Sequence, residues 1–349
     1  RPNPTMTTAY VTHQRYIEHK MQNYQHPEHP GRIQAVWDVF EANNLPERMH
    51  VLTPEPVTDE QITQVHTRKH LETLTMISNQ DQMMMYDQDT YALPETPMIA
   101  RLSAGGIVTA VDAVMRGDAD NALAAVRPPG HHATPSRAMG FCILSNVAIA
   151  ARYAQDTYNA KRVLIVDYDV HHGNGTQDVF YADDSVLFVS THQYPYYPGT
   201  GSMDETGKNG AEGTTLNVPL SAGHGDANYA RVFDEIVIPA AKRFKPDLVI
   251  VSAGFDAHHV DPLAGMKLSH TGYRDLSRKL VTLAGDVCEG KIVFALEGGY
   301  DLPAVSHGMR NVAHVLLGED DMIDSYGSAN EREPDVGGII EQVQAVHNL

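Results

Sequence analysis

Apolar and polar positions follow two different patterns along the chain. In the first third, apolar residues recur at the spacing of one helical face, as at Ile33, Val36, Trp37 and Phe40. This spacing predicts amphipathic helices over residues 31–45, 59–77 and 95–115, with a polar, methionine-rich loop over 80–93. The first third is therefore expected to be mainly helical.

From residue 121 onward, short runs of β-branched and apolar residues alternate with segments of helical length. Strands are predicted at 122–126, 163–166, 186–190, 215–218, 248–252 and 292–296, and helices at 145–158, 228–243, 271–288, 304–316 and 338–349. Four of the strands lack polar alternation, as expected where helices cover both faces of a parallel sheet. The pattern predicts an α/β fold of three layers, αβα, around a central, mostly parallel sheet. No Pro-, Gly- and Ser-rich linker divides the chain, so residues 1–349 are expected to form one domain.

Composition and charge restrict the classes of partner. Hydrophobic residues make up 42% of the chain and charged residues 20%, which are values of a globular protein. The 26 Lys and Arg against 44 Asp and Glu give a net charge of −18, which disfavours a surface that tracks phosphates. No run approaches the ~18 consecutive apolar residues that a membrane helix needs. We therefore expect no direct nucleic-acid partner and no membrane span.

Cysteine content and the first residues bear on the compartment. Cys142 and Cys288 are the only cysteines, too few for a disulfide framework or a cysteine-ligated zinc site. Residues 1–5 lack the apolar core of a signal peptide, and Met6 is expected to be the native start. The expected location is a reducing cytoplasm.

Histidine stands out, with 19 copies in the chain. Four of the predicted strands run directly into segments rich in histidine, aspartate and glycine, at 127–132, 167–175, 253–258 and 297–301. In open α/β sheets, ligands bind at the carboxyl ends of the strands, where loops from several parallel strands meet. We expect these four segments to form one crevice.

One of these segments has the spacing of a metal site. If the chain stays extended, Asp167, Asp169 and His171 point to one side, about 6–7 Å apart. Adding Asp256 from another strand end gives an open site for a divalent metal, with room for water and substrate. Alternatively, Asp167 and Asp169 only accept hydrogen bonds from backbone groups at a strand end. His171 and the second aspartate segment favour the metal.

The paired histidines His131 and His132 follow a rigid Pro-Pro-Gly turn. Neighbouring side chains diverge, so the pair is better suited to carry protons than to complete a metal site. Asp167 and Asn174 can accept a hydrogen bond from the far nitrogen of each ring, which fixes its tautomer. Tyr300 follows two glycines, where a phenol can reach the crevice and donate to a developing oxyanion, unless it is an ordinary tyrosine at a strand end.

Together these segments resemble the arginase–deacetylase superfamily, and more closely the histone deacetylase-like amidohydrolases. The shared motifs are His26-Pro-Glu-His-Pro-Gly-Arg32, Arg127-Pro-Pro-Gly-His-His132, Gly140-Phe-Cys142, Asp167-Tyr-Asp-Val-His-His-Gly-Asn-Gly-Thr-Gln177, Tyr197-Pro-Gly-Thr-Gly201, Gly254-Phe-Asp256 and Glu297-Gly-Gly-Tyr300. Their form is most similar to the class II and bacterial branch, which includes the acetylpolyamine amidohydrolases. The resemblance covers most of the chain, from His26 to Asp301.

The resemblance implies a catalytic zinc ion (Zn2+) held by Asp169, His171 and Asp256. The resemblance assigns Asp167 to a position outside the zinc ligands. There Asp167 and Ser190 would help to hold a structural potassium ion (K+).

The same resemblance assigns the two histidines and the tyrosine. Asp167 would pair with His131, and Asn174 would lie behind His132. His132 would act as general base and then as general acid, with His131 assisting electrostatically and Tyr300 polarising the substrate carbonyl.

The resemblance also implies a narrow tunnel for substrate. Phe141 and Tyr197 would form its two aromatic walls, with Gly140 lining it, and Asp89 would grip the substrate outside. Leu263 falls where a polyamine-selective relative carries a glutamate, which weakens an assignment to polyamines.

The implied activity is hydrolysis of the acetamide of an acetylated primary amine, with release of acetate. The substrate that it favours is an acetyl-lysine-like side chain. An acetylpolyamine amidohydrolase and a broader acyl-amide or ester hydrolase are alternatives with the same site. A catalytically silent acyl-lysine-binding module would be expected to lose a metal ligand or Tyr300, and neither is lost. Arginase-like chemistry fits poorly because it usually needs a two-metal site richer in carboxylates. The partner is a small-molecule or peptide substrate, and association into a homo-oligomer stays open.

Overall fold

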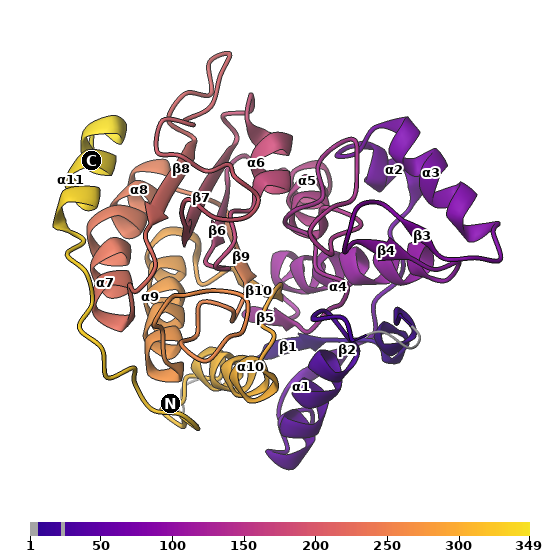
Figure 1. Cartoon of the computed structure of the whole chain (residues 1–349), viewed down its shortest axis with the longest axis horizontal. Helices are drawn as coiled ribbons and strands as arrows, with labels where there is room; N and C mark the ends of the chain where they lie inside the picture. Colours follow the sequence, from indigo (N-terminus) through magenta and orange to yellow (C-terminus); the bar gives the residue numbers. More distant parts are fainter. Residues whose placement is uncertain (1–5, 22–24) are drawn as a thin grey trace.

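The computed structural model describes residues 6–21 and 25–349, and all structural statements below concern this part of the chain. Within it, eight strands form one parallel sheet between two layers of helices (Figure 1). This arrangement confirms the predicted α/β fold with a central, mostly parallel sheet. The expectation that residues 1–5 precede the native start falls outside the described residues.

The strands with the longest apolar runs lie at the centre of the sheet. In order across it, the strands are β2 (His50–Leu52), β1 (Thr8–Val11), β5 (Asn121–Ala124), β10 (Ile292–Leu296), β9 (Leu248–Ala253), β6 (Val163–Asp167), β7 (Val186–Gln193) and β8 (Thr215–Leu220). Every residue of β6, β9 and β10 is buried, which explains why their sequences show no polar alternation. A separate antiparallel hairpin pairs β3 (Met84–Met85) with β4 (Tyr91–Ala92).

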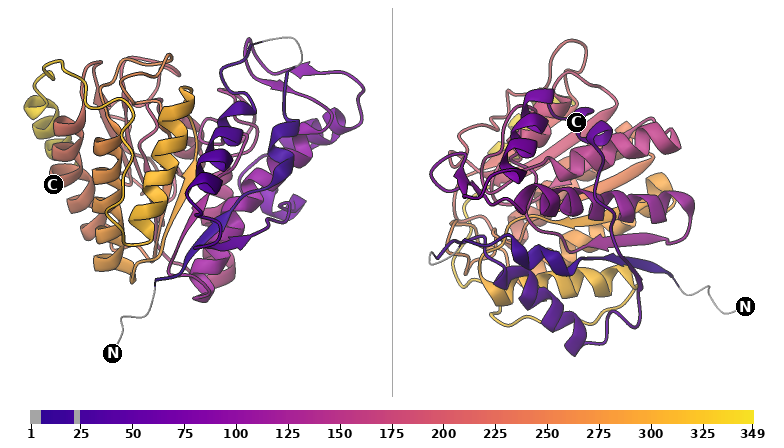
Figure 2. Two further views of the ribbon diagram at one scale, coloured as in Figure 1. Left: turned by 90° about the horizontal axis from the view of Figure 1, so that it is seen from below. Right: turned by 90° about the vertical axis from the view of Figure 1, so that its right-hand side faces the viewer.

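Helices cover both faces of the sheet (Figure 2). One layer contains α2 (Asp59–Thr63), α3 (Arg68–Ser78), α4 (Thr96–Arg116), α5 (Asn146–Tyr158) and α6 (Asn174–Phe180). The other contains α1 (Gly31–Ala42), α7 (Asp226–Val232), α8 (Ile238–Phe244), α9 (His270–Cys288), α10 (Leu302–Leu316) and α11 (Gly337–His347), with a π-helical turn (Phe233–Val237) joining α7 to α8. A short 3₁₀ helix, η1 (Gln14–Glu18), follows β1.

The predicted helix over 59–77 is wrong as a single element, because it divides into α2 and α3. Thr67 begins the second helix: its hydroxyl accepts a hydrogen bond from the backbone N–H of His70 at 3.3 Å. The Thr67 N–H itself donates to the carbonyl of Pro135 at 2.7 Å, so it is bonded outside the helix. A threonine that caps a helix thus interrupts an otherwise continuous apolar pattern.

The sequence pattern also missed several short elements. Strands β1 and β2 are four and three residues long, too short to establish a period of two. The loop predicted over 80–93 contains the β3–β4 hairpin, and α6 begins inside a histidine- and glycine-rich segment. These elements lie around the crevice and at the sheet edge, whereas the long core elements were predicted.

Helix α4 is long and apolar enough, by length and composition, to cross a membrane, with a mean hydropathy of 1.5 over its most apolar stretch. However, 72% of that stretch is buried inside the protein. Burial against the sheet on one side and α5 on the other accounts for its apolar character.

Candidate active site and metal centre

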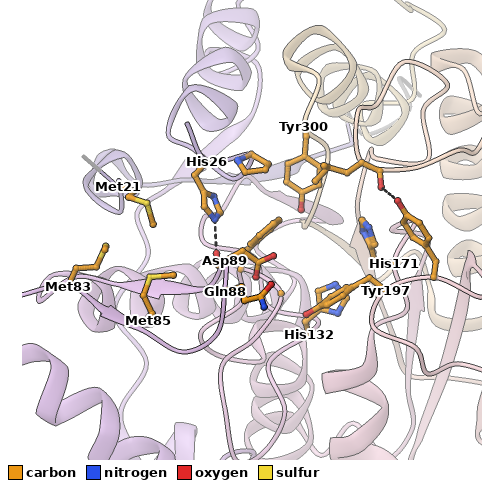
Figure 3. A pocket seen from close by; sticks show the side chains of 15 residues that line it. Met21, His26, Met83, Met85, Gln88, Asp89, His132, His171, Tyr197 and Tyr300 are labelled. Carbon is orange, nitrogen blue, oxygen red and sulfur yellow. Dashed lines mark hydrogen bonds between the residues drawn. The ribbon is translucent and has the colours of Figure 1, made fainter. Parts of the chain in front are cut away.

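Four segments predicted to converge do meet at the carboxyl end of the sheet. They follow the adjacent strands β5, β10, β9 and β6, and three of them line one end of a cavity of about 580 Å³. His132, His171 and Tyr300 lie at this end of the cavity, opposite a group of methionines (Figure 3). The topology thus brings together side chains that are more than 160 residues apart in the sequence (300 − 132 = 168).

Asp169, His171 and Asp256 form a buried cluster whose donor atoms all lie within 4.8 Å of one another. The Nδ1 atom of His171 is 3.2 Å from Oδ2 of Asp256 and 3.4 Å from Oδ1 of Asp169. Two carboxylates and an imidazole suit a divalent ion such as zinc, and three protein donors leave a position for water or substrate. The residues present therefore fit a catalytic divalent metal.

Backbone groups orient both carboxylates of this cluster. Asp169 accepts hydrogen bonds from the N–H groups of His171 (2.9 Å) and Gly298 (2.8 Å), and Asp256 accepts one from Val170 (2.9 Å). The sequence left open that these aspartates only accept hydrogen bonds from backbone groups. They do accept such bonds, and they also belong to the cluster that can hold a metal. A Cβ atom added at Gly298 would lie 2.4 Å from Oδ2 of Asp256, so only glycine fits against these carboxylates.

Asp167 lies outside the cluster, and the spacing argument that grouped it with Asp169 and His171 was wrong on this point. Strand β6 ends at Asp167, so the alternation of side chains does not continue beyond it. Its carboxylate instead accepts from His131 Nδ1 at 2.9 Å. Ser190 is the residue paired with Asp167 on β7, and it is equally buried.

A second group of possible ligands, His131, Cys142 and Glu297, suits a metal less well. Burial holds the pKa of the Cys142 thiol well above its usual value, and the thiol donates to the carbonyl of Gly140. Glu297 already accepts from the backbone N–H groups of Gly130 (2.8 Å) and His131 (3.2 Å). Glu297 therefore fixes the turn that carries the paired histidines.

The two histidine rings have centroids 4.0 Å apart but different partners. His131 Nδ1 bonds to the Asp167 carboxylate, whereas His132 Nδ1 donates to the amide oxygen of Asn174 at 2.8 Å. A neutral His132 in this tautomer carries its lone pair on Nε2.

The electrostatic surroundings of the two rings are opposite in effect. Burial would lower the pKa of His131, but Asp169 and Asp167 outweigh it and hold this pKa well above its usual value. Burial, followed by the charges of His131 and His171, holds the pKa of His132 well below its usual value. These surroundings thus favour a charged His131 and a neutral His132, a difference typical of acid–base sites.

Tyr300 lines the same cavity from the loop after β10. Burial, reinforced by the charge of Asp256, raises the pKa of its phenol well above the usual value, so the phenol stays protonated and can donate. The backbone N–H of Tyr300 donates to Asp261 at 2.8 Å, and the guanidinium of Arg32 lies 5.0 Å from the ring centroid. These contacts hold the ring at the cavity wall.

Aromatic rings form the approach to this end of the cavity. Phe141 packs edge-on against Tyr300 with centroids 5.8 Å apart, and Tyr197 packs edge-on against His132 at 5.2 Å. Leu263 and Gly140 complete this part of the lining.

Glycine is required at position 140 of this approach. Gly140 has a φ of 56°, and a Cβ added there would lie 2.5 Å from the His132 ring. The predicted tunnel residues therefore line one cavity with His132, His171 and Tyr300.

Asp89 and His26 lie at the mouth, between the methionines and the catalytic end (Figure 3). His26 Nε2 donates to the carbonyl of Asp89 at 2.6 Å, and its ring packs edge-on against Phe141 at 4.8 Å. Sequence reasoning placed Asp89 here but missed His26, although His26 begins a conspicuous His-Pro-Glu-His-Pro-Gly-Arg motif.

The rest of that motif forms a buried charge network that sequence reasoning also missed. Glu28 Oε1 pairs with Arg32 at 2.8 Å and with Arg127 at 2.6 Å, and all three side chains are almost fully buried. Arg32 also donates to the carbonyls of Gly299 and Glu297, each at 2.6 Å. The network ties the N-terminal segment to the loop that carries the tyrosine.

Comparison with known proteins places this architecture in a family. Residues 26–316 match the histone deacetylase domain. "Histone deacetylase 14, chloroplastic" of Arabidopsis thaliana is 39% identical over 344 residues, covering 93% of this chain and 81% of the relative. "Histone deacetylase 10, chloroplastic" of Oryza sativa subsp. japonica is 41% identical over 310 residues, covering 84% and 70%.

A solved structure agrees with these sequence matches. The crystal structure of the HDA15 HD domain superposes with a TM-score of 0.89 at 38% identity, covering 98% of this chain and 94% of that one. Sequence, fold and the arrangement of the site lead to the same assignment: this chain belongs to the histone deacetylase family and is an enzyme that hydrolyses acetylated amides.

Proposed function

We propose that this enzyme is a zinc-dependent deacetylase that removes the acetyl group from acetyl-lysine-like side chains and releases acetate. The observation that carries the proposal is the buried cluster of Asp169, His171 and Asp256 beside two histidines of opposite charge preference. A divalent ion in this cluster would supply Lewis acidity, which polarises a carbonyl and lowers the pKa of water.

His132 is the general base of the proposed reaction. Its Nδ1 donates to Asn174, so the lone pair on Nε2 can accept a proton from the attacking water. The same nitrogen then returns a proton to the leaving amine. His131, kept cationic by Asp169 and Asp167, favours the negative charge that develops beside it.

Tyr300 stabilises the developing oxyanion in this mechanism. Its phenol is protonated and lines the cavity that also contains His132 and His171. A preorganised donor in a buried site contributes more than the same group in water, because no solvent has to reorganise during the reaction.

The substrate class follows from the lining of the tunnel. Phe141, Tyr197 and Leu263 offer apolar contact to the methylene chain of an acetylated lysine. A polyamine would bring a second positive charge past Leu263, which offers that charge no counterion. Asp89 at the mouth is placed to accept a hydrogen bond from the substrate backbone.

We further propose that a structural potassium ion lies beside Asp167 and Ser190, which are buried partners on adjacent strands. The absence of a direct nucleic-acid partner and a cytoplasmic location stay predictions, and association into a homo-oligomer stays open.

A steady-state comparison on one preparation tests the proposed substrate. We expect kcat/KM for an acetyl-lysine peptide to exceed that for acetylated polyamines and for longer acyl-lysines. A higher kcat/KM for acetylated polyamines would show that polyamines, and not acetyl-lysine, are the preferred substrate. Equal turnover of the acyl series or of esters would indicate a broader acyl hydrolase.

A further inference from the structure

We propose that Met21, Met83 and Met85 form an apolar subsite at the mouth of the cavity, and that it binds a large apolar side chain adjacent to acetyl-lysine in a peptide substrate. This inference rests on the proposed function and specifies its substrate. All three methionines line the same cavity as His132, His171 and Tyr300. They lie together on the side away from the catalytic end (Figure 3).

Exposed apolar side chains gather at this cavity. Eleven large hydrophobic residues of the described chain are exposed, and four of them, Met83, Met85, Tyr196 and Tyr197, line this one cavity. Single exposed apolar residues are ordinary, whereas a group around a cavity marks a binding surface. Met83 and Met85 are 44% and 42% exposed, so they have apolar surface that a ligand can cover.

The local backbone explains why two of these methionines act together. Met85 lies in β3 and Met83 lies one residue before this strand, and both side chains line the cavity. Methionine is flexible and polarisable, and it adapts to apolar groups of different shape. The subsite should therefore favour bulk and apolarity more than one particular side chain.

The segment that carries Met83 and Met85 is fixed relative to the tunnel. Its turn is closed by Asp87, whose carboxylate accepts from the N–H groups of Asp89 (3.1 Å) and Thr90 (2.7 Å). The hydroxyl of Thr90 accepts from the N–H of Phe141 at 3.1 Å, which joins the segment to the tunnel wall. The subsite thus keeps a set distance from the end where the acetamide binds.

A peptide is the occupant that this arrangement favours. Asp89 lies between the methionines and the tunnel, where it can accept from a peptide N–H while the lysine side chain enters the tunnel (Figure 3). The residue next to acetyl-lysine then reaches the methionines. A polyamine has no apolar side chain that could cover the methionines.

The test uses acetyl-lysine peptides that carry either leucine or glutamine beside the acetyl-lysine, on each side in turn. We expect kcat/KM of the wild type to be roughly tenfold higher for the leucine peptide on one side. Burying the apolar area of a few methylene groups has an effect of this size. In the double variant Met83→Gln/Met85→Gln this ratio should fall close to one. The variant Met83→Leu/Met85→Leu should keep it.

Matched controls separate this effect from general loss of apolar surface. Met76 on α3 and Met98 on α4 are 47% and 42% exposed and do not line the cavity. Met76→Gln and Met98→Gln should keep the wild-type ratio, and thermal unfolding should show that all variants are folded. A leucine preference that survives in the Met83→Gln/Met85→Gln variant, or equal wild-type turnover of both peptides, would overturn the subsite alone. Failure to hydrolyse either peptide would overturn the proposed function as well.

Discussion

At the scale of single residues, two adjacent histidines differ in their hydrogen-bond partners as well as in the charges around them. Asp167 behind His131 is a carboxylate, whereas Asn174 behind His132 is a neutral amide. The carboxylate favours the charged form of its ring, and the amide only fixes the tautomer of the other. Two identical side chains on one turn therefore have surroundings that favour different protonation states.

Substitution of the two histidines should have unequal effects. His132→Ala should lose the larger share of activity, on the order of 10²–10⁴-fold, because it removes the proton carrier. His131→Ala should lose less, since it removes an assisting charge. Steady-state kcat/KM for both variants checks this, and equal losses would place the general base elsewhere.

The pH profile should respond to the group behind His132. Burial and the nearby charges hold the pKa of His132 below its usual value, so kcat/KM should fall only at acidic pH, as the ring becomes protonated. Asn174→Asp places a carboxylate behind the ring, favours its charged form and should shift this acidic limb to higher pH. A limb that stays in place in Asn174→Asp would mean that it reports another group.

Tyr300→Phe keeps the aromatic ring but deletes its hydroxyl. We expect kcat to fall by roughly 10²–10³, the range for losing one oxyanion donor. Metal content and the unfolding temperature should stay close to those of the wild type, because the contacts of the ring are kept. Near-normal turnover would show that the phenol does not stabilise the oxyanion.

At the scale of elements, the sequence predicted the long buried strands and helices but not the geometry between them. Strands β6 and β9 were predictable because both faces are buried and their residues are uniformly apolar. The position of Asp167 was not predictable from spacing, since that depends on where β6 ends.

The buried network around Glu28 was missed for a different reason. An isolated Glu or Arg in a sequence indicates an exposed position, and only the fold brings Glu28 against Arg32 and Arg127. The family motifs fixed the candidate ligands and histidines, whereas the methionines at the mouth belong to no motif.

Glu28→Gln should destabilise the protein strongly at neutral pH. It leaves two buried guanidiniums without their shared carboxylate, and breaking a buried pair in this way costs about 3–5 kcal/mol. Chemical denaturation of the variant at pH 7 measures this loss of unfolding free energy. A loss below about 1 kcal/mol would show that the network contributes little to stability.

The same group predicts an acid dependence of stability. Burial alone would raise the pKa of Glu28, but Arg127 and Arg32 outweigh it and lower this pKa from 4.5 to about 2. Its contribution is therefore complete above pH 4.5 and is lost as the pH falls towards 2. Between pH 4.5 and about 2, the unfolding free energy of Glu28→Gln should change less with pH than that of the wild type.

At the scale of the whole molecule, the C-terminal tail connects the last helices to the rest of the fold. The carboxylate of Glu333 accepts from the backbone N–H groups of Gly225 (2.9 Å), Ala227 (3.0 Å) and Asn228 (2.9 Å) at the start of α7. A carboxylate at this position satisfies donors that a helix leaves free at its first turn.

Glu333→Gln should therefore lower the unfolding free energy by about 1–2 kcal/mol, the size of a lost helix cap. Glu331→Gln is the matched control, because the Glu331 side chain is 71% exposed and forms a surface ion pair with Lys267. Chemical denaturation should show a clear loss for the first variant and almost none for the second. Equal losses would mean that the negative charge of the tail, and not the hydrogen bonds of Glu333, stabilises its position.

The central claim is that one divalent ion, held by Asp169, His171 and Asp256, is required for deacetylation. The most direct measurement is a titration of metal-stripped protein with zinc, following both bound metal and hydrolysis of an acetyl-lysine peptide. We predict that activity rises with the ion and saturates at one equivalent per chain, and that Asp256→Ala and His171→Ala show neither tight binding nor activity. Full turnover of metal-stripped protein, a requirement for two equivalents, or normal metal content and activity in these variants would contradict the claim.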